Sequence, residues 1–427
     1  MRAAIIFTVM LLWGCSGGLL GRSYSLDHQH RADLHATLRG MVVHRDGVLV
    51  ARYPLIDLDT LRLSPGGGHL VFAARSGAGW RVIVDGRPPG SSAGSSAGSS
   101  AGQPWDAVLP GSLRLGDGGQ LFFVARRGAS LFVVRTGIAP APVAEVAEGP
   151  YDGVTELQVD QDATHHGYIA RRGARAFVVL DGRELGPHEA VAELRLSPRG
   201  GRWAAIVRRA GRWWVLHDGD AVPHDSAAGL RFCPRGEHLY YVARDGGRER
   251  VVAAPRLGAP PASLPALTFA KVEWRTLQAA ASDDTTGPLY VARSEESHFL
   301  VQGGAAGPPY DSIRSPRVSE RRSADLGRRG DKEQAVIDGR PGPWYDEVAD
   351  PVTADAASAD TGYAYLGRRG ADLFLVTPGR ELPLRWALAG SLALCPDGSH
   401  VGLLGGLAAP ALQLLVDGRP VREFEAE

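Results

Sequence analysis

The chain has 427 residues, equal numbers of acidic and basic side chains and a hydrophobic fraction of 44%, which are values of an ordinary folded protein. This balance excludes the basic excess of many nucleic-acid-binding proteins and the charge excess of disordered chains. The 55 glycines and 29 prolines, without long helical periodicity, predict many turns joining short strands.

The N-terminal stretch MRAAIIFTVMLLWGCSGG has the pattern of an export signal. Arg2 precedes an apolar run from Ala3 to Trp13, which is too short to span a bilayer comfortably. Leu12-Trp13-Gly14-Cys15 resembles a bacterial lipobox and implies a signal peptide over residues 1–14 with a lipid on Cys15. The alternative is a plain secretory signal cut nearby. The serine after Cys15, in place of an inner-membrane retention aspartate, implies an outer-membrane anchor facing the periplasm.

Residues 15–40 are rich in glycine and serine and then polar, which predicts a flexible tether behind the lipidated cysteine. His28, His30 and His35 lie in this stretch near two aspartates. We interpret them as solvated polar residues because nothing in a tether fixes the geometry of a metal site. We therefore expect no metal and no cofactor.

From about residue 41 to residue 427 the chain repeats one unit, with a spacing of about 36 to 47 residues outside an insertion at 90–102. Each unit starts with an alternating Leu-Arg-Leu strand and breaks at a Ser-Pro-x-Gly turn. A second, apolar strand ends in an Arg-Arg-Gly turn, and a third strand ends in Asp-Gly, a strong hairpin signal. A short fourth strand follows, as in Tyr151-Asp152-Gly153-Val154. Four antiparallel strands per repeat predict the blades of a β-propeller.

The unit resembles the TolB-like, WD-type propeller repeats of bacterial exported proteins, whose second strand is introduced by Ser-Pro-Asp-Gly. The matching stretches are Ser64-Pro65-Gly66-Gly67, Ser197-Pro198-Arg199-Gly200, Cys233-Pro234-Arg235-Gly236 and Cys395-Pro396-Asp397-Gly398. The resemblance covers roughly residues 41–424 and implies the fold. It does not imply the role of TolB, because the helical domain that precedes the TolB propeller has no counterpart here.

Nine copies of the unit are recognisable, and residues 41–60 have the character of outer strands without a Ser-Pro start. We therefore expect one all-β propeller of about eight blades, within a range of seven to nine. The N-terminal strand is expected to complete the last blade after Asp417-Gly418-Arg419.

The insertion GSSAGSSAGSSAG at 90–102 matches the Gly-x-Ser-x-Gly pattern of serine hydrolases at Ser92, Ser96 and Ser100. A nucleophile elbow needs a preceding strand and a following helix in a parallel α/β sheet. Here an Asp-Gly turn precedes the repeat and a strand follows it, so we interpret it as a flexible loop. No catalytic residue is expected.

Cys233 and Cys395 take the same place before proline in two repeats. Blades about four apart lie too far from each other in a ring for a disulfide. We expect two buried free thiols without a redox or metal role.

Paired arginines recur at the turn between the second and third strands, which puts them on one face of the repeats. The pairs are Arg126-Arg127, Arg171-Arg172, Arg208-Arg209, Arg328-Arg329 and Arg368-Arg369. They are candidate contacts for an anionic partner, and the competing interpretation is that they are ordinary solvated turn residues. The Leu-Arg-Leu strands add four candidate channel-lining residues, Arg62, Arg114, Arg195 and Arg231.

These features predict a non-catalytic, lipid-anchored envelope scaffold that binds an unidentified envelope protein or anionic polymer, as a monomer and without nucleic acid. The alternative is an envelope enzyme, a glycan hydrolase or lyase, with its site in the propeller channel. That chemistry needs paired carboxylates or a His/Tyr/Arg set from different blades.

Overall fold

The computed structural model describes most of the chain, and the predicted signal peptide, Cys15, His28 and the 90–102 insertion lie outside the described residues. The described residues are 19–25, 29–64, 67–77, 79–88, 104–115, 119–138, 145–160, 163–199, 201–255, 267–278, 287–318, 323–353, 362–388, 390–395, 399–406 and 412–424. The chain divides into two compact units, Met1–Gly211 and Arg212–Glu427.

The first unit holds successive antiparallel sheets, and its boundary falls in the turn after β18, inside the fifth sheet. These sheets are β1 (Leu19–Tyr24), β2 (Arg31–Thr37), β3 (Gly40–Arg45) and β4 (Val48–Tyr53); β5 (Leu55–Leu63), β6 (Leu70–Ser76) and β7 (Gly79–Val84); β8 (Ala107–Val108), β9 (Arg114–Leu115), β10 (Gln120–Arg127), β11 (Ser130–Gly137) and β12 (Val146–Tyr151); β13 (Gly153–Val159), β14 (His166–Arg172), β15 (Arg175–Leu180) and β16 (Arg183–His188); and β17 (Ala190–Leu196), β18 (Trp203–Arg209), β19 (Arg212–His217) and β20 (Asp220–His224).

The second unit continues the same pattern and contains one 3₁₀ turn, η1 (Trp274–Thr276), among its described residues. Its sheets are β21 (Ser226–Phe232), β22 (His238–Asp245) and β23 (Arg248–Pro255); β24 (Lys271–Val272), β25 (Leu289–Ser294), β26 (Ser297–Gln302) and β27 (Ala305–Ala306); β28 (Ser312–Val318), β29 (Ser323–Arg329), β30 (Lys332–Ile337) and β31 (Arg340–Tyr345); β32 (Glu347–Thr353), β33 (Tyr363–Arg369), β34 (Asp372–Thr377) and β35 (Arg380–Leu384); and β36 (Trp386–Ala387), β37 (Ala393–Leu394), β38 (Val401–Gly406), β39 (Leu412–Val416) and β40 (Arg419–Phe424).

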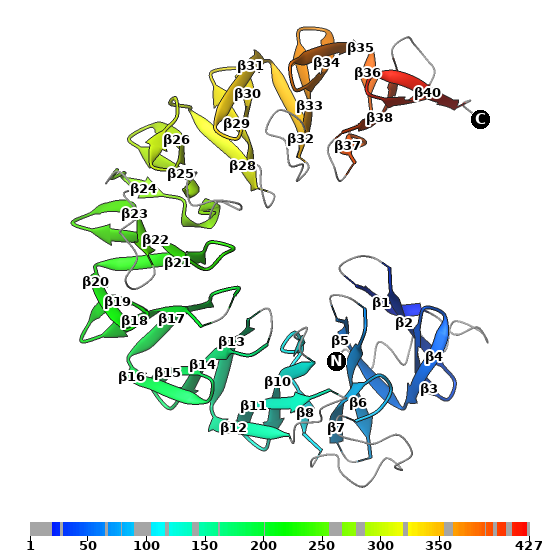
Figure 1. Ribbon diagram of the computed structural model, residues 1–427, viewed down its shortest axis with the longest axis vertical. Helices are drawn as coiled ribbons and strands as arrows, with labels where there is room; N and C mark the ends of the chain where they lie inside the picture. The colour runs from blue at the N-terminus through cyan, green and yellow to red at the C-terminus, as the bar shows by residue number, and fades with distance from the viewer. Residues whose placement is uncertain are drawn as a thin grey trace. The chain divides into compact units, whose positions relative to one another are not determined.

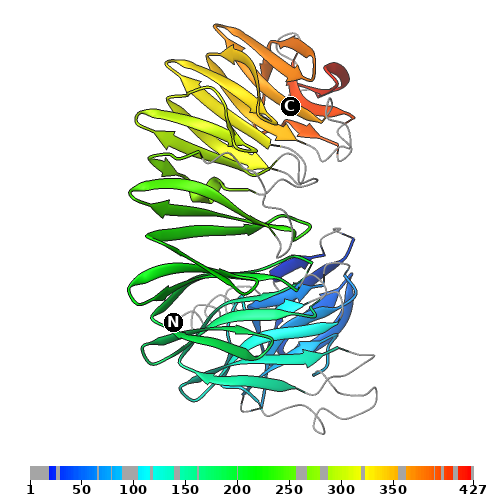
Figure 2. The same ribbon diagram turned by 60° about the vertical axis from the view of Figure 1, so that its left-hand side comes forward.

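The all-β class is confirmed, because the strands of each sheet pair antiparallel, and in eight of the ten sheets consecutive strands pair in the up-and-down order of a propeller blade. Within each unit the sheets follow one another in chain order (Figures 1 and 2). The described residues form ten sheets, more than the seven to nine blades expected from the repeats. In this described part of the chain, no helix is long and apolar enough to cross a membrane.

The extra sheet comes from the segment whose composition predicts a tether. Within residues 15–40, β1 and β2 are strands, and β2 is the partner of β3. Ala32 and Leu34 of β2 are fully buried, so this strand has an apolar face. The polar composition of the stretch as a whole did not indicate that strand. The prediction that the N-terminal strand completes the last sheet is also wrong. Residues 41–53 pair with β2 as β3 and β4, and β40 supplies the outer strand of the last sheet.

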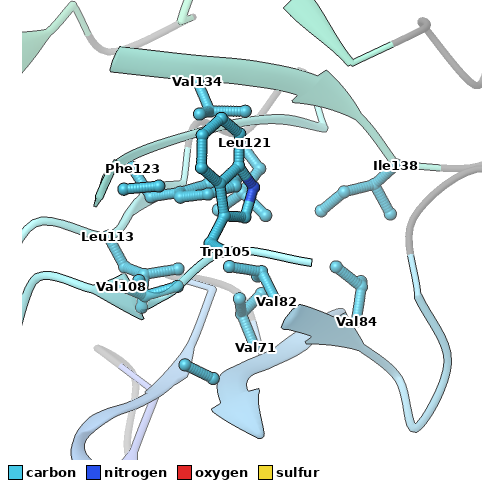
Figure 3. Packing of buried hydrophobic residues seen from close by; sticks show 12 residues of the cluster. Val71, Val82, Val84, Trp105, Val108, Leu113, Leu121, Phe123, Val134 and Ile138 are labelled. Atoms are coloured by element: carbon cyan, nitrogen blue, oxygen red, sulfur yellow. The ribbon is translucent and has the colours of Figure 1, made fainter. Parts of the chain in front are cut away.

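The second strand of most sheets is apolar on both faces, as in β6, β10 and β22, because a neighbouring sheet covers each face. Leu70 and Phe72 of β6 pack toward the β1–β4 sheet, whereas Val71 and Ala73 pack toward the β8–β12 sheet. Figure 3 shows the second of these interfaces, where Trp105 lies among valine, leucine and phenylalanine side chains. Alternation along the strand therefore builds two cores at once.

The Asp-Gly hairpins have the predicted conformation, with positive φ at both residues of the turn, as at Asp181 (49°) and Gly182 (80°). Asp181 also accepts hydrogen bonds from the His165 ring (2.9 Å) and the His166 backbone N–H (2.8 Å). Equivalent pairs of histidine and turn aspartate are His30 with Asp46, His69 with Asp85, and His400 with Asp417. In these four sheets the turn aspartate therefore joins the Asp-Gly hairpin to the start of the second strand, which gives the aspartate a structural role.

Candidate binding surface at the arginine turns

The Arg-Arg-Gly turns are held by an acidic side chain that precedes the first strand of the sheet. Asp152 Oδ2 accepts the Gly173 N–H at 2.6 Å, and the Asp152 N–H donates to the Arg171 carbonyl at 2.8 Å. The side-chain contact recurs between Asp106 and Gly128, Glu189 and Gly211, Asp225 and Gly246, Asp311 and Gly330, and Asp346 and Gly370. The stretch at 151–154, predicted to be a fourth strand, instead joins β12 to β13, because its aspartate closes this turn.

The second arginine of each pair is engaged within the protein. Arg172 binds the Glu184 carboxylate with both terminal nitrogens, at 2.9 and 2.5 Å, and its guanidinium lies 4.8 Å from the Tyr151 ring centre. Arg369 does the same with Glu381 and Tyr345. The other second arginines also contact rings. The guanidinium groups of Arg127 and Arg329 lie over the rings of Trp105 and Trp344, and Arg209 donates to His188 Nδ1 at 3.1 Å. These residues join neighbouring strands and are not free for a partner.

Both arginines of each pair are exposed, and the contacts of the first arginine differ from one pair to the next. Arg208 and Arg368 lie 3.6 and 3.7 Å from the exposed carboxylates of Glu189 and Glu347. Arg328 donates to the carbonyl of its own turn at 2.9 Å. For Arg126 and Arg171, the described residues supply no side-chain partner. Exposed ion pairs of this kind contribute little and exchange readily with other anions.

We name two rows by these first arginines and keep the two units apart. The N-terminal row consists of Arg126, Arg171 and Arg208 on three consecutive sheets of the first unit. The C-terminal row consists of Arg328 and Arg368 on two consecutive sheets of the second unit. Within each unit, the antiparallel order puts the row at the sheet ends opposite the Asp-Gly hairpins.

The four arginines of the Leu-Arg-Leu strands lie on the first strands, as predicted, but turn back onto their own backbone. Each donates from Nη1 to the carbonyl of the preceding leucine at 2.8 to 2.9 Å: Arg62, Arg114, Arg195 and Arg231. Burial and the nearby Arg62 charge lower the pKa of Arg114. Arg62 and Arg114 therefore form a local positive site within the first unit.

Arg195 has acidic partners that sequence reasoning missed. Its guanidinium lies 3.0 Å from Glu193 and 3.5 Å from Glu156, which comes from the neighbouring sheet. Burial raises the pKa of Glu156, and its Oε2 accepts the Leu194 N–H at 2.8 Å. This pair of carboxylates is what the enzyme alternative requires, but both groups already bind Arg195. A glutamate at a strand bulge has no recognisable sequence signal.

The two cysteines occupy the position of the serine in the Ser-Pro-x-Gly turn and accept the same kind of backbone hydrogen bond. Cys233 and Cys395 are free thiols, as predicted. Cys233 is buried, whereas Cys395 is only half-buried, and their sulfurs accept the backbone N–H groups of His238 and His400. In the part of the chain that the structure describes, no group of His, Cys, Asp and Glu side chains could hold a metal ion.

No protein-family model and no curated protein matches the chain. Similar solved structures include the Dos1 propeller, at 12% identity over 73% of this chain and 90% of that chain, with a TM-score of 0.34. TolB from Acinetobacter baumannii shares 13% identity over 58% of this chain and 64% of its own, with a TM-score of 0.26. The Myceliophteria thermophila Cps50 (Swd1) β-propeller domain shares 12% identity over 70% and 96%, with a TM-score of 0.28.

These likenesses are too distant to carry an argument about function. The sheets themselves define the class: this is an all-β repeat protein of the β-propeller type.

Proposed function

We propose that the chain is a non-catalytic scaffold of the cell envelope, anchored through a lipid on Cys15, that binds an anionic partner. The partner is an envelope protein with an acidic surface or an anionic polymer. The chain acts as a monomer on the periplasmic side of the outer membrane.

One observation carries the binding part of this proposal: the two arginines of each pair have different environments. The second arginines bind internal carboxylates and aromatic rings, so their sequence recurrence has a structural reason. The first arginines recur equally and are exposed as well, and Asp106 and Asp152, the turn acids beside Arg126 and Arg171, bind backbone N–H groups. Exposed guanidinium groups in a row suit carboxylate, sulfate and phosphate groups.

The anchoring part rests on the export pattern and on the Leu-Trp-Gly-Cys stretch that ends at Cys15. A Cys15→Ala variant should fail to incorporate radiolabelled palmitate and should leave the membrane fraction. The same variant is expected to lose crosslinks to an envelope partner, because the lipid holds the scaffold beside it.

The arginine surface is tested with Arg126→Gln, Arg171→Gln and Arg208→Gln combined in one variant. The matched control combines Arg87→Gln, Arg183→Gln and Arg199→Gln, which remove the same charge from exposed residues at the opposite sheet ends. Binding to immobilised dextran sulfate is measured at two salt concentrations, with neutral dextran as a blank. We expect the row variant to bind about tenfold more weakly and with a smaller salt dependence, and the control to bind like wild type.

Equal losses in both triple variants would show that only net charge matters and would refute the arginine surface. Crosslinking from the native envelope then separates the two kinds of partner. A protein adduct lost in the row variant identifies an acidic protein, and a polysaccharide adduct identifies a polymer. Absence of any adduct with wild type would contradict the scaffold.

A further inference from the structure

Arg62 and Arg114 are like charges on the first strands of two neighbouring sheets in the first unit. Arg62 lies on β5 and Arg114 on β9, and Val71 and Leu113 belong to the core that packs these two sheets together (Figure 3). Arg62 is the cross-strand partner of Val71, so its side chain leaves β5 on the face that meets the β8–β12 sheet. Burial lowers the pKa of Arg114, and the charge of Arg62 adds to that effect, so the two guanidinium groups are near each other.

Arg195, at the same place on β17, shows how the fold neutralises such an arginine elsewhere in the first unit. It folds back along its own strand, with Nη1 donating to the Leu194 carbonyl at 2.8 Å. There its guanidinium meets Glu193 of its own sheet at 3.0 Å and Glu156 of the preceding sheet at 3.5 Å. Both glutamates stand two residues before the central polar residue of the first strand in their sheets.

Thr60 and Ser112 hold the corresponding places around Arg114. Thr60 stands two residues before Arg62 in the preceding sheet, and Ser112 stands two residues before Arg114 in its own. Each hydroxyl donates to a backbone carbonyl at 2.6 Å and accepts a backbone N–H, at 2.8 Å for Thr60 and 3.1 Å for Ser112. Two hydroxyl groups therefore replace two carboxylates, and the positive charges keep no acidic neighbour at these places.

The other polar groups on the neighbouring first strands do not offset this charge. Asp57 of β5 accepts the Asp59 N–H at 3.1 Å, and burial raises its pKa. Gln158 takes the place of the arginine on β13, and its amide bonds to the backbone of Leu194 and Leu196. Among the described residues, no ion pair joins Arg62 or Arg114 to any acid.

Both guanidinium groups keep one edge open. Arg62 donates from Nη1 to the Leu61 carbonyl at 2.8 Å, and Arg114 donates from Nη1 to the Gly111 and Leu113 carbonyls at 2.6 and 2.9 Å. In the part of the chain that the structure describes, Nε and Nη2 of both arginines have no partner. Arg62 is exposed and Arg114 is half-buried, so dissolved ions can reach both.

We propose that Arg62 and Arg114 together bind one tetrahedral dianion, either inorganic phosphate or the phosphate group of a phosphomonoester. Nε and Nη2 of a guanidinium form a fork that holds two oxygens of an oxyanion. Two forks and two positive charges suit a phosphate group, whereas a carboxylate offers only two oxygens and one charge. The site is separate from the N-terminal arginine row and goes beyond the proposed scaffold function.

The test is calorimetric titration of the full chain with sodium phosphate near neutral pH, at constant ionic strength so that general screening does not change. Acetate serves as the planar anion with one charge, and wild type should bind it at least about tenfold more weakly than phosphate. Arg62→Gln and Arg114→Gln should each weaken phosphate binding by about tenfold or more, since each removes one charged fork.

Arg231→Gln is the matched control. Arg231 has the same place on β21 of the second unit and the same contact from Nη1 to the preceding leucine carbonyl, at 2.8 Å. This variant should bind phosphate like wild type. The triple variant of Arg126, Arg171 and Arg208 should also bind phosphate like wild type, which separates this site from the arginine surface.

Failure of wild type to bind phosphate, equal binding of acetate and phosphate, or unchanged binding by both Arg62→Gln and Arg114→Gln would overturn the proposal. Glycerol 2-phosphate distinguishes the two sources of the phosphate group. Binding as tight as that of phosphate identifies a phosphomonoester site, and much weaker binding identifies a site for the free ion. Thermal unfolding gives a second measurement: phosphate should raise the midpoint of wild type more than that of Arg114→Gln.

Discussion

Arg172 and Arg369 occupy equivalent turns in different units and make the same set of contacts. Each guanidinium binds a glutamate from the fourth strand and covers a tyrosine ring from the preceding sheet. Tyr151 and Tyr345 also donate their hydroxyl hydrogens to these glutamates, at 3.0 and 2.6 Å. The second arginine of the repeated Arg-Arg motif therefore stabilises the packing between strands, and this role explains its recurrence without any ligand.

This interpretation predicts that Glu381→Gln destabilises the protein by about 1 to 2 kcal/mol near neutral pH. Arg369 and the Tyr345 hydroxyl lower the pKa of Glu381 below its ordinary value of 4.5. A lowered pKa means that the stabilisation is complete above that value and is lost as the pH falls through the folded-state value. Urea unfolding of both proteins between pH 7 and pH 3 measures the difference, which should shrink toward acid.

Glu347→Gln is the matched control for this prediction. Glu347 faces Arg368 at 3.7 Å, but its side chain is 62% exposed. Solvent screens such a pair, so its loss should change stability by no more than about 0.5 kcal/mol. Equal effects of the two substitutions would show that the Arg369 contact has no special structural weight.

The hairpins depend on glycine for two separable reasons, and Gly47 and Gly86 distinguish them. Both have nearly the same backbone conformation, with φ of 83° and 84°. A Cβ on Gly47 would meet nothing within 4 Å, whereas a Cβ on Gly86 would lie 2.7 Å from the Val50 carbonyl oxygen. Gly86 therefore serves both the turn and the close approach of the neighbouring sheet.

Gly47→Ala should cost about 1 kcal/mol, the strain of a side chain in the left-handed region. Gly86→Ala should cost clearly more, because backbone atoms of β4 must also shift. Thermal unfolding of the two variants measures this comparison. A Gly86→Ala variant no less stable than Gly47→Ala would mean that the two sheets adjust without strain.

The first sheet gives the chain an extended folded core at its N-terminal side. Leu70, Phe72 and Ile83 are fully buried in a cluster that also contains Ala32 and Leu34 of β2. Removal of a polar tether would not change the stability of the fold, whereas this segment covers the apolar face of β6. Its removal should expose apolar side chains of the first unit to water.

Deletion of residues 19–40 should therefore lower the urea midpoint strongly, by the equivalent of more than about 3 kcal/mol. Deletion of residues 90–102 is the contrasting variant, because its Gly/Ser/Ala repeat is predicted to be a flexible loop. That deletion should leave the midpoint close to wild type. If both deletions were neutral, β1 and β2 would not contribute to the folded core.

Local features of this chain are determined by the sequence alone. Alternating apolar residues, Ser-Pro-x-Gly breaks and Asp-Gly pairs depend on contacts within one strand or one turn. They predict antiparallel four-stranded repeats, the hairpin conformation and the placement of the arginine pairs at one turn. The free thiols follow as well, because repeat position separates Cys233 from Cys395.

Features that depend on neighbouring sheets were decided by tertiary packing. The β1–β2 strands, the different fates of the two arginines in each pair, and the pairing of Glu156 with Arg195 all arise between segments far apart in the chain. Asp325 shows the reason most directly. Its sequence context is that of an ordinary repeat, and only the packing of the folded β28–β31 sheet shows that it is completely buried. Periodicity reports which face a residue takes, whereas the neighbours that meet it there are set by packing between sheets.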